Sequence, residues 1–257
     1  SYVKWDMNRN MTEIGSPAWP AKKQKEVAHR YMLGLYKILE NITSNFPNIL
    51  FESCSGGGGR FDGGMLYYMP QTWTSDDTDA IERLMIQEGT SLVYPTSSMG
   101  SHVSAVPNHQ VHRITPLNTR GVVAMAGSFG YELDVTKMNE EEKEEVKKQV
   151  EFYKNIRSTV QFGDLYRLKS SFDSNEAAWM NLSKDGKEVV VSYVKKYAEA
   201  NVIPRRLKVK ALDENSLYEV IETGEVFGGD ELMYIGLEIG ELMGDYQAKN
   251  WTLRKVD

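Results

Sequence analysis

Apolar and polar positions follow two periods in the first two thirds of the chain. Residues 2–7 and 49–55 are short, mostly apolar runs beside turn residues, which is typical of buried strands. Between them, apolar residues recur every three or four positions from 27 to 42 and predict a helix that lies on a core. Repeated strand–helix units of this kind predict a parallel sheet. The same patterns predict further strands at 72–77, 91–95 and 128–135, helices at 79–88, 121–126 and 140–160, and a long polar loop at 96–120.

The pattern changes near Gly163, where short alternating runs replace the strand–helix units. Turn residues such as Asp185-Gly186 separate these runs, which predicts an antiparallel β-sandwich. We therefore expect an α/β part at 1–163 and an all-β part at 164–257. The strands expected in the second part are 165–170, 178–183, 188–197, 206–212, 217–222, 233–239 and 250–256.

Composition and charge narrow the class of protein. The 257 residues are 41% hydrophobic and 26% charged, which is ordinary for a globular protein with ample core. A net charge of -6 argues against nucleic acid or an acidic membrane as a partner, and no run approaches the ~20 apolar residues of a membrane span. The single cysteine, Cys54, excludes an internal disulfide and favours a cytoplasmic location.

Polar side chains stand where the predicted parallel strands end. Asp6, Cys54 and Asp76 occupy these ends, the place where a β/α barrel carries its chemistry. About five strand–helix units are present and a closed barrel needs eight, so we expect a partial (β/α)8 barrel.

Two carboxylates across a glycosidic bond are what glycoside hydrolysis requires. Lys4, on the same strand face as Asp6, would keep that carboxylate ionised. The alternative is that these aspartates only form turns or cap helices, with Asp77 or Asp79 as the cap in the segment TSDDTD.

A glycine run at 56–59 follows the predicted strand 49–55 directly. Glycine lets a backbone approach a ligand closely, so a substrate-lining loop with Cys54 as a pocket wall is favoured. A phosphate-binding loop fails, because no GKS/T ending follows. His109 and His112 lack the carboxylate or cysteine framework of a metal site, so we expect no metal; the role of His102 stays open as well. The indoles of Trp5, Trp19 and Trp73 either stack on sugar faces or belong to the core.

Taken together, these segments resemble the α-galactosidases of glycoside hydrolase family 36. The resemblance rests on KWDMNR (4–9), ESCSGGGGRFDGGML (52–66) and WTSDDTDA (73–80), in that order and spacing. MGSHVSAVPNHQ (99–110) and TRGVVAMAGSFGYELD (119–134) resemble the same family. The first three motifs together are specific, whereas any one alone would not be.

The resemblance implies a retaining mechanism on a (β/α)8 barrel without metal or cofactor. It implies Asp6 as the nucleophile at the end of barrel strand four and Asp76 as the acid/base at the end of strand six, with Asp77 as the less favoured candidate. Positions matching the family's substrate contacts are Lys4 and Asn8 beside the nucleophile, and Cys54 and Gly56 in the loop that lines the galactose pocket.

The implied function is hydrolysis of terminal α-galactosides such as melibiose and raffinose-type oligosaccharides. Family members carry an N-terminal β domain and three barrel strands ahead of KWDMNR, so we expect a C-terminal portion that self-associates or pairs with the missing half. Alternatives are a transglycosylase of the raffinose-synthase type, a non-catalytic galactose-binding or structural fragment, and specificity for the 2-acetamido sugar, which the narrow Cys54–Gly59 loop disfavours.

Overall fold

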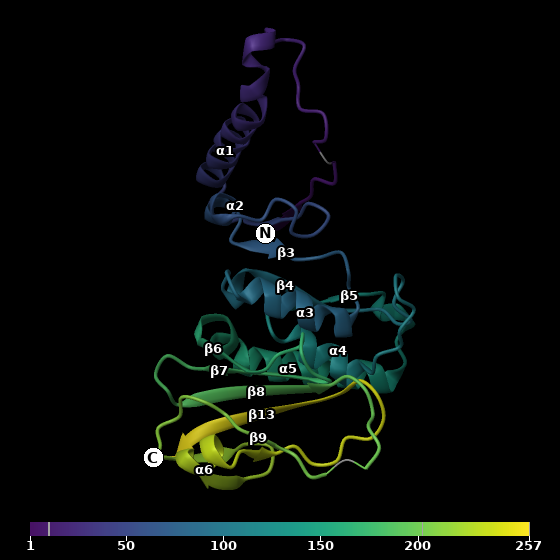
Figure 1. Cartoon of the computed structure of the whole chain (residues 1–257), viewed down its shortest axis with the longest axis vertical. Helices are drawn as coiled ribbons and strands as arrows, with labels where there is room; N and C mark the ends of the chain where they lie inside the picture. The colour runs from purple at the N-terminus through teal and green to yellow at the C-terminus, as the bar shows by residue number, and fades with distance from the viewer. Residues whose placement is uncertain (10, 202, 257) are drawn as a thin grey trace. The chain divides into compact units, whose positions relative to one another are not determined.

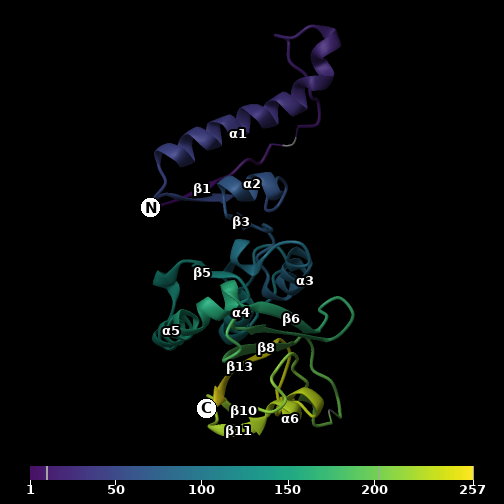
Figure 2. The same ribbon diagram turned by 90° about the vertical axis from the view of Figure 1, so that its left-hand side faces the viewer.

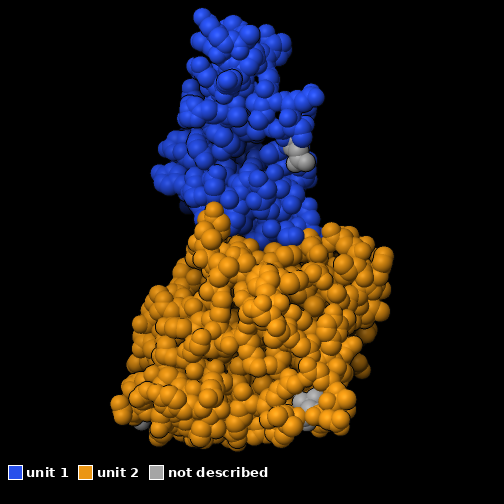
Figure 3. Space-filling view, viewed as in Figure 1, with its two compact units in different colours: residues 1–76 blue, residues 77–257 orange. Residues whose placement is uncertain are grey.

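The computed structural model describes residues 1–9, 11–201 and 203–256. The chain forms two compact units, residues 1–76 and 77–257, which Figure 3 colours separately. The boundary expected at 163 to 164 falls between a helix and a strand of the second unit and stays a prediction.

The first unit contains three parallel strands in the order β1-β2-β3. In the register of these strands, Lys4 lies opposite Glu52 and Glu52 opposite Gln71. The elements are β1 (Tyr2–Trp5), η1 (Ala21–Glu26), α1 (Val27–Asn45), β2 (Leu50–Ser53), α2 (Gly63–Tyr68) and β3 (Gln71–Trp73). Figure 2 labels α1, α2, β1 and β3.

Alternation along these strands separates a core face from a polar face. Trp5 and Phe51 pack against the two helices, whereas Lys4 and Glu52 point to the opposite face. Burial of the apolar face is what holds α1 and α2 on the sheet. The buried residues of this core are Leu35, Leu39, Phe51, Met65 and Met69.

The second unit begins with two further strand–helix pairs. Strand β4 (Met99–Ser104) pairs in parallel with β5 (Ser128–Glu132). The accompanying helices are α3 (Ala80–Ser91), α4 (Leu117–Ala124) and α5 (Glu140–Phe162), with single turns η2 (Thr96–Ser98) and η3 (Val135–Lys137).

The strand expected at 91–95 is wrong. Ser91 still belongs to α3, and the following residues turn back on it, since the amide of Tyr94 donates to the carbonyl of Thr90 at 3.0 Å. Leu92 and Val93 are exposed, so this apolar run has no sheet to join. The fourth strand is β4, inside the expected loop 96–120, where its polar residues concealed it.

The remaining strands form a six-stranded antiparallel sheet in the order β11-β10-β13-β8-β7-β6. A second, two-stranded sheet pairs β9 with β12. The expected strand 233–239 begins inside helix α6, and only 237–238 is a strand. The bounds are β6 (Asp164–Lys169), β7 (Glu176–Leu182), β8 (Glu188–Lys195), β9 (Arg206–Leu207), β10 (Leu217–Val220), β11 (Glu225–Gly228), α6 (Gly229–Tyr234), β12 (Leu237–Glu238) and β13 (Gln247–Val256).

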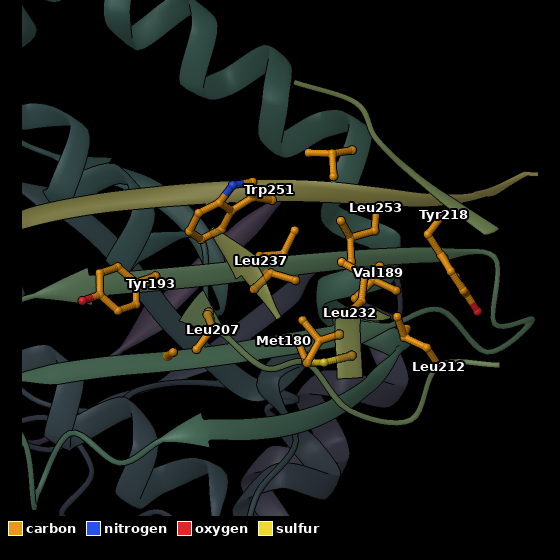
Figure 4. Packing of buried hydrophobic residues seen from close by; sticks show 14 of the residues in the cluster. Met180, Val189, Tyr193, Leu207, Leu212, Tyr218, Leu232, Leu237, Trp251 and Leu253 are labelled. Carbon is orange, nitrogen blue, oxygen red and sulfur yellow. The ribbon is translucent and has the colours of Figure 1, made fainter. Parts of the chain in front are cut away.

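Both faces of the large sheet are covered, which explains the unbroken apolar run in β8. Val189 and Val191 face the cluster that includes Leu207 and Leu237 from the small pair (Figure 4). Val190 and Val194 face the opposite way and pack with residues of helices α3, α4 and α5. Figure 1 shows β7, β8 and β13 side by side, with α4 and α5 on one side and α6 on the other.

The expected fold class is confirmed. Five successive parallel strands, three in the first unit and two in the second, alternate with helices as in a partial (β/α)8 barrel. An antiparallel β domain follows them. No helix among the described residues is long and apolar enough to cross a membrane.

Candidate active site

Asp6 follows strand β1 directly, and its carboxylate is held on both oxygens. The amide of Met7 donates to Oδ1 at 2.8 Å, and Nδ2 of Asn8 donates to Oδ2 at 2.9 Å. The other amide atom of Asn8, Oδ1, accepts from the backbone amide of Gly56 at 2.8 Å. Asn8 therefore fixes the orientation of the Asp6 carboxylate relative to the glycine loop.

The surroundings of Asp6 favour its ionised form. Partial desolvation raises the pKa of this carboxyl, but hydrogen bonds from Cys54, Asn8 and the amide of Met7, with the charge of Lys4, lower it further. The pKa of Asp6 therefore lies below its ordinary value. Such a carboxylate is suited to attack a carbon atom, and unsuited to deliver a proton.

Cys54 forms a wall beside this carboxylate. The residue follows β2, is 1% exposed, and its backbone amide donates to the carbonyl of Trp5 at 3.1 Å. Burial raises the pKa of the Cys54 thiol; the amide of Gly57 opposes this, and the neighbouring Asp6 adds to it. The net result is a raised pKa, so the group remains a thiol at neutral pH and donates to Asp6 instead of acting as a nucleophile.

The glycine loop (residues 56–59) contacts the segment after β1 and the segment after β3. Its backbone runs with positive φ at Gly56 (53°) and Gly57 (85°). A Cβ on Gly57 would lie 2.5 Å from the Cα of Ser75, and the amide of Gly58 donates to the carbonyl of Thr74 at 3.2 Å. The loop thus contacts Asn8 through one glycine and the segment that carries Asp76 through the next two.

The aspartates after β3 have separate tasks. Asp79 caps α3, because its carboxylate accepts from the amides of Ile81 and Glu82. Asp77 accepts from the amide of Asp79 at 3.0 Å. The capping alternative therefore applies to Asp79, while Asp76 is exposed at the edge where the glycine loop arrives.

Lys4 contacts Glu52, which the sequence did not single out, and Trp73, one of the three candidate indoles. Its Nζ lies 3.7 Å from Oε1 of Glu52 and 4.6 Å from the ring centroid of Trp73. Glu52 is fully buried and accepts from the Tyr2 hydroxyl and from Nε2 of Gln71. An acidic residue inside the apolar run ILFESCS was the available signal for Glu52, but only the strand register places it opposite Lys4.

The remaining candidates lie elsewhere. Trp5 belongs to the core that packs against α1. The ring centroid of Trp19 lies 4.5 Å from Cζ of Arg30. Of the three indoles, Trp73 is the one whose ring contacts the ammonium of Lys4. His109 and His112 lie on the loop after β4. Across residues 1–9, 11–201 and 203–256, no three His, Cys, Asp or Glu side chains gather closely enough to hold a metal ion.

Comparison with known proteins assigns the family. Residues 1–163 match the melibiase family model. The chain belongs to the melibiase family. Residues 176–253 match the C-terminal domain of glycosyl hydrolase family 36, so the resemblance found in the motifs is confirmed.

Several melibiase relatives are longer than this chain. It is 62% identical to alpha-galactosidase AgaA of Geobacillus stearothermophilus over 256 residues, covering 100% of this chain and 35% of that protein. Identity to alpha-galactosidase Mel36A of Lactobacillus acidophilus is 53%, again over 100% and 35%. A crystal structure of an AgaA variant with raffinose superposes with a TM-score of 0.97 at 61% identity, covering 100% of this chain and 36% of that one. The chain thus spans about a third of these melibiase relatives.

Alanine at Gly57 is expected to disrupt the loop more than alanine at Gly56. Both residues have positive φ, but only at Gly57 would the new Cβ meet backbone atoms. We expect Gly57→Ala to lower the free energy of unfolding by about 2–4 kcal/mol and Gly56→Ala by about 1–2 kcal/mol. Urea unfolding measures both, with Gly34→Ala in helix α1, where space is open, as the control. Equal losses at the two loop positions would contradict the close approach of the loop to Ser75.

Proposed function

We propose that this chain supplies the catalytic edge of a retaining α-galactosidase that acts on α-galactoside oligosaccharides. This edge is formed by the carboxyl ends of the parallel strands, with Asp6 and Asp76. The observation that carries the proposal is the glycine loop, which contacts the Asp6 side of the edge through Asn8 and the Asp76 side through Ser75. Two carboxylates are thereby tied to one loop at the carboxyl ends of parallel strands, where β/α barrels hold their chemistry.

In this proposal Asp6 is the nucleophile and Asp76 the acid/base. Asp6 attacks the anomeric carbon while Asp76 protonates the leaving oxygen, and a covalent galactosyl ester forms. Asp76 then takes a proton from water, which attacks the same carbon and releases galactose with retained configuration. The lowered pKa of Asp6 supports its role, because the nucleophile must be ionised.

The sugar-binding roles follow from position. Lys4 and Asn8 flank Asp6 with polar groups that can contact hydroxyls, while Cys54 and Gly56 line the adjoining wall. At Gly56 nothing lies within 4 Å of a would-be Cβ, so the backbone there is open to a ligand.

The relatives support the choice of substrate and of aspartates. Structures of AgaA variants contain raffinose and stachyose. Each of these two variants has one aspartate replaced. The two replaced aspartates are the same number of residues apart in that chain as Asp6 and Asp76 are here. Self-association or pairing with an N-terminal half stays a prediction, favoured by exposed Tyr2 and Val3 on β1, and a cytoplasmic location stays one as well.

The stereochemistry of the first product tests this function. Proton NMR of an aryl α-galactoside reaction should show α-galactose first, followed by slow mutarotation to β-galactose, because two displacements restore the configuration. Asp77→Asn is the matched control and should give the same product, since Asp77 bonds the helix start. β-Galactose as the first product would contradict the nucleophilic role of Asp6. Accumulation of galactosyl-sucrose from added sucrose in place of free galactose would indicate a transglycosylase.

A further inference from the structure

Glu52 is a buried carboxylate to which the proposed mechanism gives no task. Its side chain is 0% exposed on the polar face of strand β2. Both uncharged donors, the Tyr2 hydroxyl and Nε2 of Gln71, bind the same oxygen, Oε2. The other oxygen, Oε1, is buried and has no hydrogen-bond partner.

The free oxygen faces the ammonium of Lys4. Nζ lies 3.7 Å from Oε1, the strand register sets the two residues opposite each other, and the indole of Trp73 lies 4.6 Å from Nζ. The Lys4 side chain keeps 35% of its surface exposed, so it is held by a buried carboxylate and is still partly open to solvent. Its charge also acts on Asp6.

This arrangement restricts a flexible side chain. A lysine loses rotamer entropy when a ligand immobilises it, and a side chain fixed beforehand avoids that loss on binding. A buried carboxylate is expensive to desolvate, and an apolar or amide residue would serve packing as well. Retaining the charge at Glu52 therefore needs a reason beyond packing.

We propose that Glu52 is a positioning residue that acts through Lys4, fixing the ammonium for a sugar hydroxyl and holding it off the Asp6 carboxylate. The inference rests on the proposed function of the edge, in which Lys4 contacts the galactoside. The charge of Lys4 already acts on Asp6, so without Glu52 the ammonium would turn toward the nucleophile.

A double-mutant cycle tests the link between the two residues. The probe is 1-deoxygalactonojirimycin, which an AgaA variant binds in its crystal structure, and the measurement is calorimetric titration. We expect Glu52→Gln and Lys4→Met each to weaken binding up to about tenfold, the size expected when one long side chain loses its pre-organisation. The double variant should bind no more weakly than Lys4→Met alone, within about twofold. Additive losses, or an unchanged affinity in Glu52→Gln when Lys4→Met weakens binding, would overturn the inference.

Controls separate folding and charge from positioning. Glu26→Gln makes the same chemical change in an exposed pair with Arg30 and should leave the affinity unchanged. Tyr2→Phe removes one donor to Glu52 and keeps the charge, so it should weaken binding less than Glu52→Gln and only when Lys4 is present. If Glu52→Gln fails to fold, Tyr2→Phe with and without Lys4→Met tests the inference in its place.

A second measurement needs no ligand. Cys54 is the only cysteine, so the carbon-13 shift of its Cβ reports the titration of one thiol. Glu52→Gln should lower the pKa of this thiol more with Lys4 present than in the Lys4→Met background, because the released ammonium moves toward Cys54 and Asp6. An equal fall in both backgrounds would overturn the inference. If the thiol responds as expected but neither Asp6→Asn nor Lys4→Met affects the affinity, the proposed function fails and the positioning of Lys4 stands.

Discussion

Asp6→Ala is expected to lower turnover of an aryl α-galactoside by about 10⁴-fold or more, the size seen when one member of a catalytic group that acts as a unit is removed. The carboxylate is held by Met7 and Asn8 in one orientation, and no other ionised group is held in the same way at the end of β1 among the described residues. The measurement is the initial rate of phenol release by the purified chain.

Rescue by a small anion identifies the role of the lost group. Azide should restore part of the turnover of Asp6→Ala and yield β-galactosyl azide, because it attacks from the face that Asp6 vacates. Asn8→Ala is the matched variant: it keeps the carboxylate but loses one hydrogen bond to it, so we expect a loss of about 10- to 100-fold without azide rescue. Undiminished turnover in Asp6→Ala would remove the nucleophile from the proposal.

Strand ends were the part of the site that the sequence predicted well. Asp6, Cys54 and Asp76 lie where expected because parallel strands gather their carboxyl ends at one edge, whatever the details of packing. The glycine run was expected to line the substrate. Its contacts with Asn8 and Ser75 add a second task, which depends on the position of the loop in space and has no signal in the run itself.

Glu52 and strand β4 escaped prediction for related reasons. Both place polar side chains where a sequence pattern expects apolar ones: one oxygen of Glu52 accepts from Tyr2 and Gln71, and Ser101 of β4 donates to Gln87 of α3 at 2.5 Å. Buried polar groups of this kind are stable only with partners distant in sequence.

The sequence predicted only one of the two interactions of Lys4. The charge of Lys4 does lower the pKa of Asp6, as the spacing along one strand suggested. Its ion pair, however, is with Glu52, which lies on the next strand and is identified as a neighbour only by the register.

Asp76→Ala is expected to lower turnover strongly for substrates with poor leaving groups and to spare the first step for substrates with good ones. When raffinose is cleaved, sucrose leaves as an alkoxide unless its oxygen is protonated, so the turnover of raffinose should fall by about 10²- to 10⁴-fold, the range of general acid catalysis. A dinitrophenyl galactoside needs no protonation, so formation of the galactosyl ester should stay fast while its hydrolysis slows. Stopped-flow absorbance should then show a burst of phenol release followed by a slow steady state.

Azide distinguishes the two roles of Asp76, as general acid in the first step and as general base in the second. As an anion that needs no general base, it should speed the slow phase of Asp76→Ala and give α-galactosyl azide, the opposite anomer to that from Asp6→Ala. Asp77→Ala removes the neighbouring carboxylate, which bonds the start of α3, and should show neither burst nor rescue. If Asp77→Ala, and not Asp76→Ala, shows this behaviour, the acid/base is Asp77 and the contact of the glycine loop with Ser75 and Asp76 serves only the fold.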